Sequence, residues 1–278
     1  MTTPQQMLER SAAARAHDEE AALTRTAFVG FATIVIREFN RIIRIWGQTI
    51  VPPAITATLY FVIFGSLIGR RVGVMGGFDY KQYIAPGLIM MSVITNSYGN
   101  VVASFFGAKF GKHVEELLVS PLPNWVIVAG YATGGIVRGM LVGLAVTVVS
   151  LVFTHLHVHH LGLILSALVL TSLTFALAGF LNALFAKNFD QVNWIPSFVL
   201  TPLTYFGGVF YSVSLLPDWA RTLSYVNPIL YMVNAFRYGF LGVSDVDVGA
   251  AFALMAGAAV VLFAIAVGLM NRGTGTRE

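Results

Sequence analysis

Six long apolar runs constrain this chain more than any other feature. A helix needs about 20 mostly apolar residues to cross a bilayer. Runs of that length lie at about residues 50–69, 83–106, 125–153, 162–186, 193–211 and 249–270. Charged residues make up 11% of the chain, against roughly 25% of a soluble domain. We therefore predict an all-α polytopic membrane protein with six transmembrane helices.

The basic residues indicate how those helices are oriented. An even number of spans places both termini on one side of the membrane. If that side is the cytoplasm, eleven lysines and arginines lie there and five lie outside, which is the asymmetry that the positive-inside rule favours. We expect both termini in the cytoplasm.

Composition excludes several classes of function. The chain has no cysteine, so disulfides and thiolate metal sites are excluded. Its net charge of +4 is spread between apolar runs, a pattern that fits membrane lipid and not nucleic acid.

The N-terminal part divides into two segments. Residues 1–25 lack the apolar core of a signal peptide and predict a short disordered cytoplasmic tail. Residues 26–48 predict an amphipathic helix lying in the membrane interface. Its Arg37, Arg41 and Arg44 recur at helical spacing and would anchor the helix to lipid head groups, while an apolar stripe sinks into the acyl boundary.

A charged island, "AKFGKHVEELLVSPLP", interrupts the apolar pattern at residues 108–123. We expect a helix over about 109–119, ended by Pro121 and carrying an i, i+4 pair between Lys112 and Glu116. In a cytoplasmic loop such a helix offers a surface to another protein. The alternative is a loop stabilised only by its own charges, and the residues leave these two interpretations open.

The segment between the last two runs, residues 212–242, is too polar to span a membrane and too aromatic for a free loop. Irregular backbone at membrane depth is tolerated where protein buries it. We expect short re-entrant helices that dip into the outer leaflet.

Two polar residues lie inside the apolar runs. Arg138 sits near the middle of the third run and Asn182 in the fourth. An arginine there costs at least about 2.5 kcal/mol on insertion scales, so it should face the protein interior or a wet cavity, with Asn182 or backbone carbonyls as acceptors. The alternative is that Arg138 extends towards the cytoplasm.

Signals for chemistry are weak. "HLHVHH" at residues 155–160 offers four imidazoles in a short turn, too few convergent ligands for a metal site, and we predict none. "GAKFGKH" lacks the spacing of a phosphate-binding loop. We predict no catalytic residue and no nucleotide site in this chain.

Two segments resemble one known family. "EELLVSPLP", residues 115–123, resembles the segment that follows the second span of ABC-2 type permeases, the membrane subunits of one class of bacterial ABC exporters. Residues 202–242 resemble the signature of the same family between its fifth and sixth spans. The resemblance covers about residues 30–274.

This resemblance implies a fold and a set of partners. Residues 44–274 would form an ABC transmembrane type-2 domain, 26–48 its connecting helix and 109–119 a coupling helix. Two copies of the chain would assemble with two copies of a separate ATPase, which binds ATP and Mg²⁺, in the bacterial inner membrane. The residues implied to contact the ATPase are Lys109, Phe110, Lys112, His113, Glu115, Glu116, Leu117 and Leu118.

The implied activity is export by alternating access. Polysaccharides, lipid-linked molecules and drugs are all substrates of the family, and nothing in the residues selects among them. Four aromatic residues of the fifth run are candidates for lining the path: Tyr205, Phe206, Phe210 and Tyr211. A stand-alone secondary transporter or channel is the alternative from another class.

Overall fold

The computed structural model describes the backbone of residues 4–275 and the side chains of residues 23–275 apart from Leu118. Helices form nearly all of it: α1 (Pro4–Arg44), α2 (Trp46–Tyr60), α3 (Gly69–Val72), α4 (Tyr80–Phe110), α5 (His113–Val119), α6 (Asn124–Phe153), α7 (Leu161–Phe185), α8 (Phe189–Ile195), α9 (Thr201–Tyr205), α10 (Asp218–Val226), α11 (Pro228–Leu241) and α12 (Val248–Asn271). Two π-helical segments, η1 (Phe61–Ile68) and η2 (Pro196–Leu200), join α2 to α3 and α8 to α9, and η3 (Val213–Leu215) is a 3₁₀ turn. The described part is therefore an all-α bundle with one small hairpin.

Five helical stretches in the described part are long and apolar enough to cross a membrane: Trp46–Val72, Tyr80–Phe110, Asn124–Phe153, Leu161–Phe185 and Val248–Asn271. They coincide with five of the six expected runs. The multi-pass, all-α class is thus supported.

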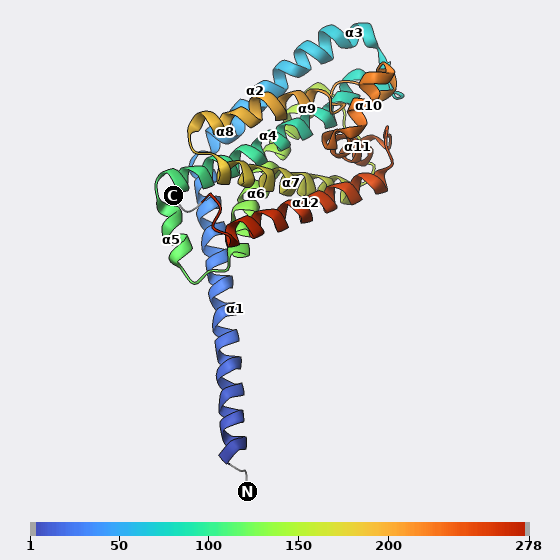
Figure 1. Cartoon of the computed structure of the whole chain (residues 1–278). Helices are drawn as coiled ribbons and strands as arrows, with labels where there is room; N and C mark the ends of the chain where they lie inside the picture. Colours follow the sequence, from blue (N-terminus) through green and yellow to red (C-terminus); the bar gives the residue numbers. More distant parts are fainter. Residues whose placement is uncertain (1–3, 276–278) are drawn as a thin grey trace.

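The remaining expected run, 193–211, differs from the prediction. Its helix begins earlier, at Phe189, and passes through α8, η2 and α9 to end at Tyr205. Pro196 and Pro202 each remove an amide donor, and Gly208, with a φ of 70°, makes a turn that helical geometry does not allow. The stretch still runs along the bundle beside α2 and α4 (Figure 1), but residues 206–211 form turns.

The bundle is built around α4. Its side chains are buried along most of its length against α6, α7 and α11. In Figure 1 the long helices run roughly side by side while α1 projects from one end. Burying the central helix on several sides while leaving apolar outer faces exposed is what a bundle in lipid requires, because lipid is as apolar as the core.

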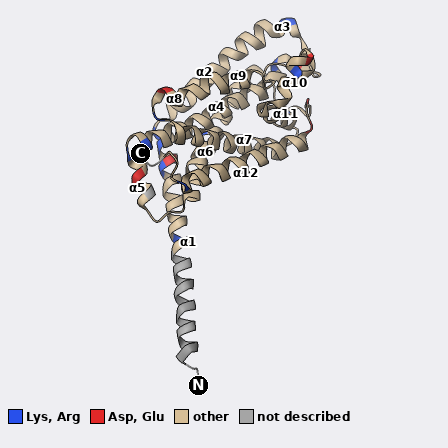
Figure 2. Ribbon diagram, viewed as in Figure 1, with Lys and Arg blue, Asp and Glu red and all other residues tan. Residues whose placement is uncertain are grey.

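Two opposite ends of the bundle carry the loops and the charges. One end holds α5 and the last turn of α12. At this end the side-chain amide of Asn124, which follows α5, donates to the side-chain oxygen of Asn271 at 2.8 Å. The other holds the hairpin of β1 (Val74–Met75) and β2 (Phe78–Asp79), the 154–160 segment and α10. Figure 2 shows charged residues gathered at these ends and nearly absent between them.

The expected boundary at residue 25 has no counterpart in the backbone. Instead of a disordered tail and a separate helix, α1 is continuous from Pro4, and residues 1–3 lie outside the described part. Alanine, glutamate, leucine and arginine dominate residues 8–24, and these have high helix propensity. The sequence contained that signal, and the tail interpretation did not use it.

Close packing of α4 gives a first prediction. A Cβ at Gly87 would lie 2.5 Å from the Val209 carbonyl oxygen and 2.9 Å from its Cα, whereas one at Gly99 on the same helix meets nothing within 4 Å. We expect Gly87→Ala to destabilise the chain by about 1–3 kcal/mol through overpacking. The matched Gly99→Ala should be neutral or stabilising by up to about 1 kcal/mol. Unfolding midpoints in detergent measure both, and equal midpoints would contradict this packing.

Candidate functional site

The charged island forms a short helix, but a shorter one than predicted. α4 continues through Lys109 and Phe110, Gly111 ends it, and Lys112 turns the chain with a left-handed φ of 60°. α5 then begins at His113 and ends at Val119, before Ser120 and Pro121. The expected start at residue 109 is wrong because the chain leaves helical geometry after Phe110 and the left-handed Lys112 separates α4 from α5.

The residues implied to contact an ATPase fall into different environments. Lys109 donates its Nζ protons to the carbonyl oxygens of Leu184 at 2.8 Å and Ala186 at 3.0 Å, so it caps the end of α7. Leu117 is partly buried against the core, and the side chain of Leu118 lies outside the described residues. The exposed members of the set are Phe110, Lys112, His113, Glu115 and Glu116.

Charges on α5 do not pair as expected. Lys112 precedes the helix, and the described side chains form no Lys112–Glu116 ion pair. A carboxylate oxygen of Glu116 instead lies 4.0 Å from the Nδ1 of His113, and both side chains are largely exposed. Such an exposed contact contributes little to stability. Lys112 and Glu115 line a cavity of about 410 Å³ beside the 186–188 turn, with Lys187 and Phe106. Both sides of α5 thus present unneutralised charge.

The basic stripe of α1 faces the bundle in two of its three positions. Arg37 donates to the Tyr131 hydroxyl at 2.6 Å, and Arg41 donates to Glu38 at 2.8 Å and to the Asn100 side chain at 2.8 Å. The Glu38 side chain is 1% exposed and also accepts from Ser104. Arg37 stays 46% exposed beside these partners, and Arg44 is exposed on the surface. This differs from the expected lipid anchor, because the stripe meets polar partners on α4 and α6 that periodicity alone does not reveal.

Arg138 and Asn182 do not meet. Asn182 donates to the Val192 carbonyl oxygen at 3.0 Å and so ties the end of α7 to α8. Arg138 lines a cavity between α2, α4 and α6. The structure thus places the half-buried Arg138 towards a partly open cavity, in agreement with one of the two interpretations of the sequence.

The four aromatic candidates of the fifth run separate into two groups. Tyr205 and Phe206 are each 40% exposed, while Phe210 is buried and stacks on Phe64 with ring centroids 4.5 Å apart. Tyr211 donates to the carbonyl oxygen of Tyr205. The hydroxyls of Tyr205 and Tyr60 lie 3.0 Å apart, joining α9 to α2. Only Tyr205 and Phe206 have the exposure that a path-lining residue needs.

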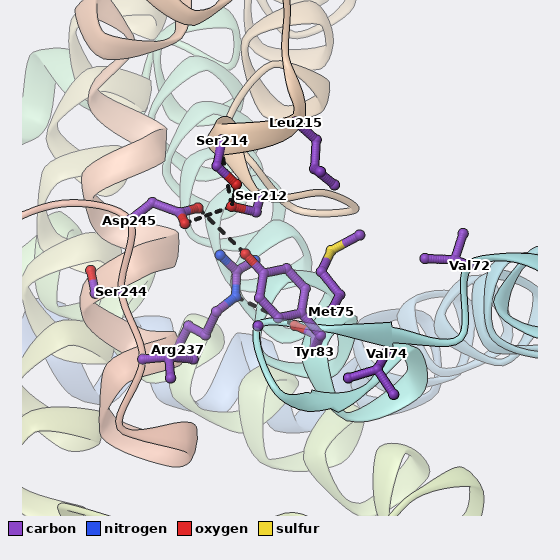
Figure 3. Close-up of a pocket in the computed structure, with 12 residues that line it drawn as sticks. Val72, Val74, Met75, Tyr83, Ser212, Ser214, Leu215, Arg237, Ser244 and Asp245 are labelled. Carbon is purple, nitrogen blue, oxygen red and sulfur yellow. Dashed lines mark hydrogen bonds between the residues drawn. The ribbon is translucent and has the colours of Figure 1, made fainter.

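Sequence reasoning missed a buried polar cluster at the end opposite α5 (Figure 3). Arg237 of α11 is wholly buried, donates to the Gly208 carbonyl oxygen at 2.6 Å and lies 4.1 Å over the Tyr83 ring. Asp245 accepts from Ser212 at 2.6 Å and from the Val213 amide at 3.1 Å. Burial lowers the pKa of Arg237, an effect that Tyr83 and Asp245 oppose. The sequence did contain a signal for this cluster, because Asn234 and Arg237 lie one helical turn apart in an apolar segment.

This cluster borders a cavity of about 490 Å³ between the hairpin, η3 and the 243–245 turn. Its polar atoms are already engaged with one another, since Asn234 accepts from the Asp245 amide at 2.9 Å and Arg237 holds the turn after α9. The cluster therefore fixes α11 and the 208–213 segment to one another and to α4. The two short helices expected over 212–242 are present as α10 and α11.

The histidine turn, residues 155–160, packs against α11. The His159 and His160 amides both donate to the Gly239 carbonyl oxygen, and both rings pack on Tyr238. Among the described residues no three His, Cys, Asp or Glu side chains converge as metal ligands.

Comparison with known proteins decides the family. The ABC-2 type transporter family model matches residues 29–241, from within α1 to the last residue of α11. The chain belongs to the ABC-2 type transporter family. It is 54% identical over 251 residues to the inner membrane transport permease YadH of Escherichia coli K12, which covers 90% of this chain and 98% of that protein.

More distant relatives are nodulation proteins. Nodulation protein J of Neorhizobium galegae is 23% identical over 215 residues, covering 77% of this chain and 82% of its own length. Its counterpart in Rhizobium leguminosarum bv. viciae is 24% identical over 215 residues. The chain is thus a multi-pass inner membrane permease component of an ABC transporter.

Proposed function

We propose that this ABC-2 permease is the membrane subunit of a bacterial exporter, assembled as a homodimer with two copies of a separate ATPase. ATP and Mg²⁺ would bind in that ATPase. Closing of the ATPase dimer would move α5, the proposed coupling helix, and the spanning helices would rock to open a path outward. The substrate would be a polysaccharide, a lipid-linked molecule or a drug.

The exposed side chains on and beside α5 support the proposed contact with the ATPase. Phe110, the last residue of α4, is 64% exposed although its ring packs on Phe189, and His113 and Glu116 of α5 have only their exposed 4.0 Å contact with each other. Charged groups at a rim steer association, and an exposed aromatic residue is a frequent anchor at an interface. Val114 holds α5 in place because it is buried in the core, and Lys109 fixes the end of α4 to the end of α7.

Charge distribution supports a cytoplasmic position for the α5 end. Arg44, Lys112, Lys187 and Arg272 are exposed at or near that end, while Arg237, which the sequence count assigned to the outside, is buried and does not count. This strengthens the positive-inside asymmetry. Both termini would then be cytoplasmic.

The outer face of α2 supports the proposals of a homodimer and of a transport path. Apolar residues exposed on it include Val51, Ile55 and Leu59, and Tyr60 joins it to the exposed Tyr205. An apolar face of this kind meets either lipid or a second copy of the chain. We propose that α2 and α9 of two copies face one another across the path.

Reconstitution with the ATPase tests the proposal. The purified permease should have no ATPase activity alone. In vesicles with its ATPase subunit it should give an assembly with two copies of each chain, hydrolysing ATP and moving a labelled substrate away from the ATP side. Substrate movement without an ATPase would support a secondary transporter and overturn the proposal; movement towards the ATP side would overturn the direction.

A further inference from the structure

Arg138 is a cation at membrane depth that has no partner in the described part of the chain. It lies near the middle of α6, and the described residues offer it no hydrogen bond and no ion pair; its Nε is buried and unsatisfied. A charged side chain inside a membrane protein is normally paired or placed at a functional cavity. The unpaired guanidinium is therefore the feature to explain.

The surroundings of Arg138 carry excess positive charge. Glu38 is the nearby carboxylate: it packs on Gly134, one helical turn before Arg138. Both of its oxygens are already engaged, one by Arg41 and the other by Ser104, with Arg37 at 3.8 Å. Glu38 thus serves Arg37 and Arg41 and leaves Arg138 without a carboxylate, so a second anionic group would balance the three arginines better than any rearrangement of these four side chains.

A cavity of about 350 Å³ opens in front of Arg138. One wall is a single face of α2, because the residues that line it recur every four positions: Gln48, Pro52, Thr56 and Tyr60. The other wall is α4, with Ser92, Thr95 and Asn96. Ser92, Thr95 and Asn96 already donate to carbonyl oxygens of their own helix. The donors left to bind phosphate, sulfate or carboxylate oxygens are the Arg138 guanidinium, the Gln48 amide and the Thr56 hydroxyl.

A second copy of the chain would not supply the missing charge. The described carboxylates other than Glu38 are Asp79, Glu115, Glu116, Asp190, Asp218, Asp245 and Asp247. All lie in the terminal loops or short helices at the two ends of the bundle (Figure 2). A copy related by an axis along the membrane normal would hold them at the same depths, away from Arg138.

The flank of the cavity indicates what carries the anion. Val51, Ile55 and Leu59 form an exposed apolar stripe on α2 beside the lining residues, and Met91 lines the cavity itself. A free inorganic ion would have to leave water to reach this depth, whereas an amphiphile would bring its anionic group with an apolar chain packed along α2. We propose that the cavity between α2, α4 and α6 binds the phosphate, sulfate or carboxylate group of an anionic amphiphile, with Arg138 as its counter-ion.

Calorimetric titration of the full-length chain in neutral maltoside micelles tests this site. Dodecyl phosphate is the probe, dodecanol its uncharged match and inorganic phosphate the free anion. Dodecyl phosphate should bind saturably, and Arg138→Gln should weaken it at least about tenfold, the loss expected for a charge-assisted hydrogen bond. Arg138→Lys should keep part of the affinity and Gln48→Ala should lose part of it.

The matched control is Arg272→Gln, which removes one exposed arginine at the end of α12 and should bind as the wild type does. Equal affinity in Arg138→Gln, or equally tight binding of dodecanol, overturns the anion site. Inorganic phosphate binding as tightly as dodecyl phosphate overturns the amphiphile. If Arg138→Gln fails to fold, unchanged affinity in both Arg138→Lys and Gln48→Ala overturns the site. The permease is titrated alone, so the result is independent of the proposed ATPase and of export.

Discussion

Glu116→Lys should abolish coupling to the ATPase while leaving the permease folded. The Glu116 side chain is 81% exposed and its contact with His113 is 4.0 Å, so its replacement should change the unfolding free energy by no more than about 0.5 kcal/mol. At an interface, however, reversing a charge opposite its complement costs several kcal/mol, and each 1.4 kcal/mol is about a tenfold loss of affinity. We expect the ATPase recovered with the permease, and the ATP-driven transport, to fall at least about tenfold.

The control for this experiment is Asp218→Lys. Asp218 is an acidic residue exposed on α10 at the opposite end of the bundle, so the same charge reversal there should leave assembly unchanged. Co-purification, ATP hydrolysis and detergent unfolding are measured on both variants. Normal assembly and transport in Glu116→Lys would show that the exposed α5 charge does not contact the ATPase.

Glu38→Leu should be among the most destabilising single substitutions in the bundle. The change leaves Arg41, which is 29% exposed, and Arg37 without their carboxylate, and breaking a buried ion pair by removing one partner costs about 3–5 kcal/mol. It also leaves the Ser104 hydroxyl without its acceptor. We expect a matching drop in the unfolding free energy, measured by denaturant titration in mixed micelles.

A double variant separates lost charge from lost packing. In Glu38→Leu/Arg41→Leu both charges are gone, and replacing a buried pair by apolar residues of similar volume is often neutral. The double variant should recover most of the loss, apart from the Asn100 hydrogen bond to Arg41. If the double variant is as unstable as the single one, the cost lies in packing and not in an unpaired arginine.

Local patterns sufficed where an element depends on neighbouring residues alone. The apolar runs over 83–106, 125–153, 162–186 and 249–270 became α4, α6, α7 and α12 because any such run must form a helix to satisfy its backbone in lipid. The short helix in the charged island was predictable from its spacing and from the proline that ends it, and the helices over 212–242 from a segment too polar to span and too aromatic for a free loop. The positions where helices end or distort were harder to predict. α4 ends before Gly111, and Pro196 and Pro202 distort the fifth run.

Partners distant in the sequence could not be predicted this way. Arg41 and Asn100 are 59 residues apart, Arg37 and Tyr131 are 94, and Arg237 and Tyr83 are 154. Helical periodicity gives the direction in which a side chain leaves its own helix, not what the facing helix offers. Arg37 and Arg41 were therefore assigned to lipid, and Arg237 was counted as an exposed outer charge although it is buried.

By itself the sequence determined the membrane class, the helical spans, the position of the α5 segment and the family, because these follow from apolar length and from motifs contiguous in the chain. Only the tertiary structure decided which charges are neutralised: Glu38 takes two arginines, Arg237 is held by backbone carbonyls, and Arg138 faces a cavity with no partner among the residues that the structure describes. The physical reason is that pairing acts over a few ångströms between helices, and those distances exist only once the bundle has packed.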